Sequence, residues 1–204
     1  MSWMTLLRVG AEIAAGTSAA DPQLQFFENF PGHLGAAFVA RSQNTLSVHA
    51  VNIPLSLSFN NVVMLFTRGA NNATRSGSIT HQFGLYSLNG STLSLANSAS
   101  GTDNWGGANT STVWVSMVTS ATQNISPGAW YLVYNGSVST NAAGANNLGM
   151  YANSSLNPAN AIPGGFLMGR MTGSTNAMPG SIATSDLDIT GSDAIRQPFI
   201  IITA

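Results

Sequence analysis

Three histidines are the side chains best suited to bind a metal or move a proton. They are His33, His49 and His81. Together with a carboxylate they could form a zinc site, but their spacing matches no zinc motif. His81 falls on the apolar side of an alternating run, so the pattern favours a hydrogen-bonded histidine of the core over a ligand or a catalytic base.

Acidic residues near the C-terminus offer one possible cation site. Asp186 and Asp188 would face the same side of a strand, and with Asp193 and loop carbonyls they could supply the oxygen ligands that Ca²⁺ prefers. Residues 186–193 do not match the EF-hand pattern, so a polar edge strand followed by a turn is the favoured interpretation. The seven acidic residues of the chain indicate no particular pair for a glycosidase.

Aromatic side chains could form a platform for sugar stacking. Trp105 is the best candidate, because we expect it in a loop beside the polar side chains of Asp103 and Asn104. The alternative, which we favour, is that Trp105 packs over an edge of the core.

Several classes of enzyme are excluded by missing residue types. The chain has no Lys and no Cys, which rules out P-loop lysines, Schiff bases and cysteine nucleophiles. No G-x-S-x-G and no H-E-x-x-H motif occurs. We therefore predict a protein that is not an enzyme, with no catalytic residues, no bound metal and no cofactor.

The composition favours packing within an assembly. Only 6% of the 204 residues are charged, against roughly 25% in an ordinary soluble domain, whereas 44% are hydrophobic. The six basic residues are scattered arginines, so no nucleic-acid partner is expected. No apolar run approaches the roughly 20 residues that span a bilayer, so membrane insertion is not expected either. Few charges keep neighbouring copies apart.

The elements that would position these side chains are β-strands. Apolar residues recur at every second position in five runs, which are 46–50, 55–59, 79–85, 113–117 and 130–134. Two continuous apolar runs, 62–66 and 199–202, predict strands that are buried on both faces or lie at an interface. We predict an all-β fold, an antiparallel β-sandwich of jelly-roll type, over residues 45–204.

Glycine turns should connect these strands. Asn89 and Gly90 lie between two alternating runs, and as the central pair of a two-residue turn they predict a β-hairpin. Pro127 and Gly128 suit the centre of a type II turn that leads into the run 130–134.

Residues 1–44 show weak periodicity and are predicted to form a docking segment or arm. Phe26, Phe27 and Phe30 are closely spaced between two prolines, where neither a regular helix nor a central strand is expected. Three aromatic rings need burial. They either cap the core of their own domain or dock on a neighbour, which makes them the candidate interface residues.

Two segments carry a resemblance to a known group of proteins. Residues 83–100, FGLYSLNGSTLSLANSAS, resemble a hairpin of the form G-[LI]-Y-[ST]-x-N-[GA]-S-T-L-S-L followed by a Ser/Gly-rich loop. Residues 127–132, PGAWYL, resemble a later P-G-x-[YW]-[YW]-L strand. Both patterns are typical of structural proteins of tailed bacteriophages. The resemblance implies a virion β-sandwich domain of capsid surfaces, fibres or tail tips, and it implies no catalytic residues.

We therefore expect a bacteriophage virion structural protein on the particle surface, either a capsid decoration (cement) protein or a short fibre component. The absence of a stalk repeat argues against a full-length tail fibre. Its expected partners are other copies of itself, as a homotrimer, and virion proteins such as the major capsid or tail protein. Its expected location is the virion, after assembly in the host cytoplasm. The alternative is a carbohydrate-binding receptor-recognition (adhesin) module for host attachment, which would bind a host surface glycan.

Overall fold

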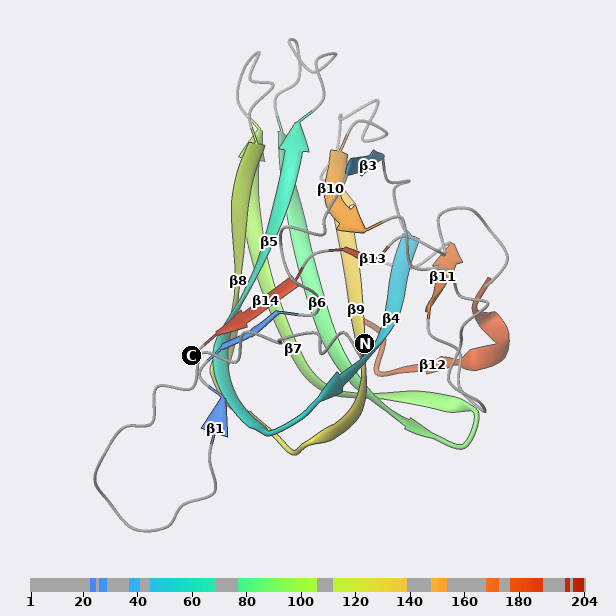
Figure 1. Cartoon of the computed structure of the whole chain (residues 1–204). Helices are drawn as coiled ribbons and strands as arrows, with labels where there is room; N and C mark the ends of the chain where they lie inside the picture. The colour runs from blue at the N-terminus through green and yellow to red at the C-terminus, as the bar shows by residue number, and fades with distance from the viewer. Residues whose placement is uncertain are drawn as a thin grey trace, which may run out of the picture.

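The structure is a computed structural model of the chain (Figure 1). The residues that it describes are 23–24, 26–28, 37–40, 45–68, 77–105, 112–138, 148–153, 168–172, 177–188, 197–198 and 200–203. No helix among these residues is long and apolar enough to cross a membrane.

Strands dominate the described residues, and one short 3₁₀ helix, η5 (Thr184–Asp186), accompanies them. The strands are β1 (Gln23–Leu24), β2 (Phe26–Glu28), β3 (Ala37–Ala40), β4 (Thr45–Ile53), β5 (Ser56–Arg68), β6 (Gly77–Asn89), β7 (Thr92–Trp105), β8 (Thr112–Ile125), β9 (Gly128–Val138), β10 (Leu148–Asn153), β11 (Met168–Thr172), β12 (Ser181–Ala183), β13 (Gln197–Pro198) and β14 (Ile200–Thr203).

All of these strands belong to one sheet, which curls into a half-barrel (Figure 1). Its main order is β11-β4-β9-β6-β7-β8-β5-β10-β13, while β14 pairs with β5 and β2, and β12 pairs with β7. The pairs are antiparallel except for β1 and β5. The predicted all-β, antiparallel class is confirmed. The sandwich and jelly-roll details stay predictions.

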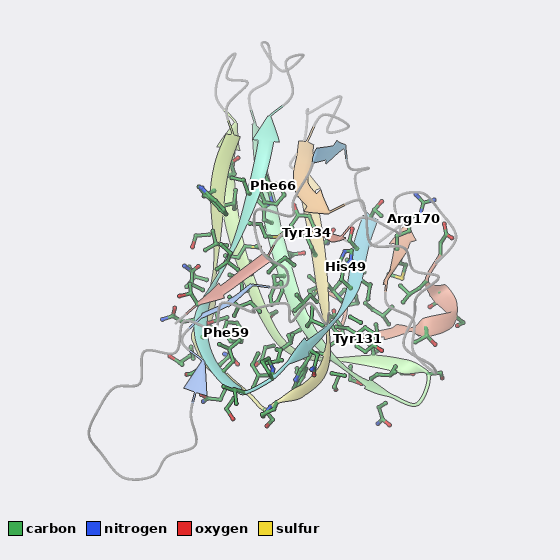
Figure 2. The ribbon with its side chains drawn as sticks, in the orientation of Figure 1. His49, Phe59, Phe66, Tyr131, Tyr134 and Arg170 are labelled. Atoms are coloured by element: carbon green, nitrogen blue, oxygen red, sulfur yellow. The ribbon has the colours of Figure 1, made fainter. Side chains whose placement is uncertain are left out.

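The concave side of the curled sheet holds the larger hydrophobic cluster. Alternate residues of the long strands point to this side, as the two-residue period of a strand requires. Figure 2 shows Phe59, Phe66 and Tyr134, which belong to this cluster. All three side chains are fully buried, so they anchor β5 and β9 to a common core.

A second hydrophobic cluster covers part of the opposite side. Residues 177–188 lie across this part and contribute Ile182 and Leu187, which pack with Tyr86, Tyr131 and other side chains of the sheet. The Tyr86 hydroxyl donates a hydrogen bond to the carbonyl of Pro179, which ties the covering segment down. Burial raises the pKa of Tyr86 and, less strongly, of Tyr131.

The hairpin predicted at Asn89 and Gly90 exists, but its turn lies one residue further along. Asn89 is the last residue of β6 and pairs with Thr92, so the two central residues are Gly90 and Ser91. Gly90 has a φ of 60°. A positive φ at the first central position is common to the two turn types, I′ and II′, whose twist suits a two-residue hairpin, and glycine adopts it without strain.

Strands from the N-terminal part of the chain join the same sheet. β1 pairs with β5, β2 with β14 and β3 with β10. The described residues of this part, 23–24, 26–28 and 37–40, thus contact the strands of 45–204 through their backbone. Whether these residues act as a separate docking arm stays a prediction.

Candidate functional site

The side of β5, β8 and β14 that faces away from the core forms the candidate site. These three strands are neighbours, with β5 in the middle. The sequence predicted that residues 62–66 and 199–202 would be buried on both faces or lie at an interface. Among the described residues, only one face of each is buried, because Val63, Leu65 and Ile201 on the other face are each partly exposed. This partial exposure excludes burial on both faces and leaves a position at an interface.

Two large apolar side chains of β8 complete this surface. Trp114 is 53% exposed and Val118 is 57% exposed. They alternate with Val115 and Met117, which point into the core. We call this surface the outer patch, and its residues are Asn61, Val63, Leu65, Trp114, Ser116, Val118, Ser120, Ile201 and Thr203.

The outer patch contains apolar and neutral polar side chains and no charged one. The strand register places Leu65 opposite Trp114 and Val63 opposite Ser116. The Ser116 hydroxyl donates a hydrogen bond to Oδ1 of Asn61, which joins β8 to β5 at the surface. A hydrophobic ridge with neutral hydrogen-bonding groups beside it is suited to contact with another macromolecule rather than to acid–base chemistry.

The backbone beneath the outer patch is held in place at both edges of β8. On the β7 side, a Cβ atom at Gly101 would run into the carbonyl oxygen of Ser116, so this close approach of the strands needs glycine. On the β5 side, the strand register shifts at Asn60. There the Thr119 hydroxyl lies 2.6 Å from the carbonyl of Ala121 and 3.2 Å from that of Asn60. The patch is therefore a preformed surface.

The prediction for His81 is confirmed. Its side chain is fully buried, and its Nδ1 lies 2.7 Å from the Tyr134 hydroxyl in a hydrogen bond. The His81 ring is 4.5 Å from the ring of Phe66, measured between centroids. His49 is also buried, on β4 facing the concave side, although its alternation suggested a polar face. His33 lies outside the described residues.

One of the acidic residues near the C-terminus, Asp188, is used in a structural contact. Asp188 exchanges two backbone hydrogen bonds with Arg170, and its Oδ2 accepts a third from Nε of Arg170 at 3.1 Å. Asp186 lies in η5, and Asp193 lies outside the described residues. No group of three metal-binding side chains occurs among the residues that the structure describes. Figure 2 shows Arg170 on β11, away from the main core.

The candidate sugar contact differs from its prediction in one respect. Asp103, Asn104 and Trp105 form the end of β7 and pair with β6, so they do not lie in the expected loop. The side chains of Asn104 and Trp105 are outside the described part of the structure. A sugar contact at these three residues stays a prediction.

The candidate interface phenylalanines are placed only in part. Phe26 and Phe27 lie in β2, where they pair with Thr203 and Ile202 of β14. Their side chains, and the whole of Phe30, lie outside the described residues. Their backbone therefore adjoins the strand that carries Ile201, one of the outer-patch residues.

The sequence did not single out the outer patch as a whole, although two signals pointed to parts of it: the interface alternative for 62–66 and 199–202, and the position of Trp114. Trp114 stands out of phase with Val113, Val115 and Met117, so alternation alone places it on the opposite face. What the sequence could not show was whether another segment of the chain covers that face.

Comparisons with known proteins give no family for this chain. No protein-family model matches it, and no curated protein matches it with significance.

Proposed function

We propose that this chain is a structural protein of a bacteriophage particle that acts by assembly, as a capsid decoration protein or a short fibre component. The observation that carries the assembly role is the outer patch, where Trp114 and Val118 are more than half exposed on a preformed sheet. Exposed apolar side chains that gather on one surface are typical of protein–protein contacts.

The low charge of the chain supports the same role. With six basic and seven acidic residues among 204, little self-repulsion opposes close packing of copies. The assignment to a phage particle rests on the resemblance of residues 83–100 and 127–132. These two segments are neighbours in the fold, since they lie in the β6–β7 hairpin and at the start of β9, and β9 pairs with β6.

Quantitative mass spectrometry of purified particles tests this proposal. Particles from a lysate that contains the protein are banded by density, and the copies of this chain are counted against the major capsid protein. Hundreds of copies per particle support a decoration protein, and a few dozen or fewer support a tail or fibre component. Its presence in the lysate together with its absence from the particle band would refute the proposal.

The alternative function is a carbohydrate-binding module for host attachment. The half-exposed indole of Trp114 favours it, because it offers a flat apolar face on the same side of β8 as the exposed hydroxyl-bearing Ser116, two residues further along. Binding to a host glycan array that is lost in Trp114→Ala would support this alternative. Binding that survives this change would place any glycan site elsewhere, including at Trp105.

A further inference from the structure

We propose that the outer patch binds the outer patch of a second copy of this chain, face to face across a two-fold axis that crosses β8 near Met117. This inference rests on the proposed function, because it names the first contact through which the chain would assemble. The argument uses the order of side-chain sizes along β8, the absence of charge and the area of the surface.

Side-chain size alternates along the outer side of β8 in a self-complementary order. Its successive outward residues are Trp114, Ser116, Val118 and Ser120, so large and small side chains alternate along the strand. A two-fold axis at Met117 reverses this order in the second copy. Trp114 then faces Ser120 of the other copy, and Val118 faces Ser116. Each large side chain meets a small one, as two packed sheets about 10 Å apart require.

The absence of charge also suits pairing with an identical surface. A two-fold contact places each residue near its own copy or near a symmetry-related neighbour, so a charge close to the axis meets a like charge. None of the described side chains of the outer patch is charged. The adjoining outward residues of β7, which include Ser98, Ser100 and Thr102, are neutral and exposed as well, so the charge nearest in the register is at the far edge, where Glu28 of β2 pairs with Ile201.

The size of the surface predicts a weak, reversible pair. The strands β7, β8, β5 and β14, at about 4.8 Å each, span roughly 19 Å, and the outward residues of β8 from Trp114 to Ser120 extend over roughly 20 Å. Two such faces would together bury roughly 800 Å², which is in the range of weak, transient contacts. We therefore expect dissociation in the micromolar range or above rather than in the nanomolar range.

Sedimentation velocity of the full chain at micromolar concentrations tests the pair. We expect a species of twice the 21.1 kDa chain mass. Val118→Asp should raise its dissociation constant at least about tenfold, because it buries two like charges close together. Leu88→Asp is the matched control: Leu88 is also an exposed large apolar residue, at 38%, but it lies at the β6–β7 hairpin. It should leave the association unchanged.

A pair of substitutions separates a second copy from any other partner. Trp114→Ser should weaken the association, and adding Ser120→Trp should restore it, because the large residue again faces a small one across the axis. Ser120→Trp alone places two indoles opposite each other and should also weaken the association. A different protein bound to the patch would not be rescued by this exchange.

Crosslinking locates the contact. The chain has no cysteine, so Ser116→Cys is a unique thiol in the centre of the patch, and Ser126→Cys is a unique exposed thiol just beyond the end of β8, ten residues away. A short bismaleimide should join two copies through position 116 and not through position 126. Near-native unfolding curves confirm that each variant is folded before it is compared.

Four results would overturn the inference: a monomer at all concentrations, a species of three times the chain mass, Val118→Asp without effect, or no rescue by Ser120→Trp. A monomer that binds a glycan, with binding lost in Trp114→Ala, would instead favour the adhesin. The proposed function is tested separately from this pairing. A monomer that is still found in particles would refute the pairing and leave the proposed function intact. A dimer that is absent from particles would support the pairing and refute the proposed function.

Discussion

Removing the Tyr134 hydroxyl tests the buried hydrogen bond at the centre of the concave core. Tyr134→Phe keeps the ring, which lies 5.5 Å from the ring of Phe66, and deletes only the group that is 2.7 Å from Nδ1 of His81. Both side chains are fully buried, so water does not replace the lost partner without rearrangement. We expect the free energy of unfolding to fall by about 1–3 kcal/mol. For a chain of this length, each kcal/mol lowers the melting temperature by roughly 2–4 °C.

A double-mutant cycle with His81→Leu separates the hydrogen bond from packing. Leucine has a volume close to that of histidine and no polar atom, so the double variant leaves no polar group of this pair in the core. It should be more stable than the sum of the two single losses predicts, with a coupling energy of about 1 kcal/mol or more. Urea unfolding of the four proteins at neutral pH measures this. Independent, additive effects would refute the reasoning, and so would a Tyr134→Phe variant as stable as the parent.

Three further predictions concern other parts of the fold. Because burial raises the pKa of Tyr86 in the folded chain, its contribution to stability should be complete below about pH 10 and then decline by up to about 1.4 kcal/mol per pH unit; alkaline urea titrations of the parent and of Tyr86→Phe should show a smaller slope in the variant. Gly101→Ala should lower the free energy of unfolding by more than about 2 kcal/mol, because its methyl group meets the Ser116 carbonyl, and a neutral result in urea unfolding would contradict the close approach of β7 and β8. Arg170→Ala should cost less than about 1 kcal/mol in the same assay, because the ion pair with Asp188 is partly exposed.

The sequence alone was sufficient for the fold class and for much of the core. Alternation is a local property, and it correctly assigned Val115 and Met117 to one face of β8 and His81 to the apolar face of β6. The sequence also located the hairpin at Gly90, because a two-residue hairpin turn requires a positive φ, which glycine adopts without strain. The one-residue error in the turn arose because Asn-Gly and Gly-Ser both satisfy such a turn, and only the strand register decides between them.

Tertiary structure decided everything that depends on which strands become neighbours. The pattern of β4 suggested one polar face, yet His49 is buried, because the sheet curls and its concave side encloses that face. The apolar run 62–66 predicted either burial on both faces or a position at an interface, and only the assembled sheet decided between them, because Val63 and Leu65 lie on a partly exposed surface beside β8. Periodicity reports how the residues of one strand divide between two faces. Whether a face is covered depends on segments distant in the sequence, so the outer patch emerges only when β5, β8 and β14 are assembled.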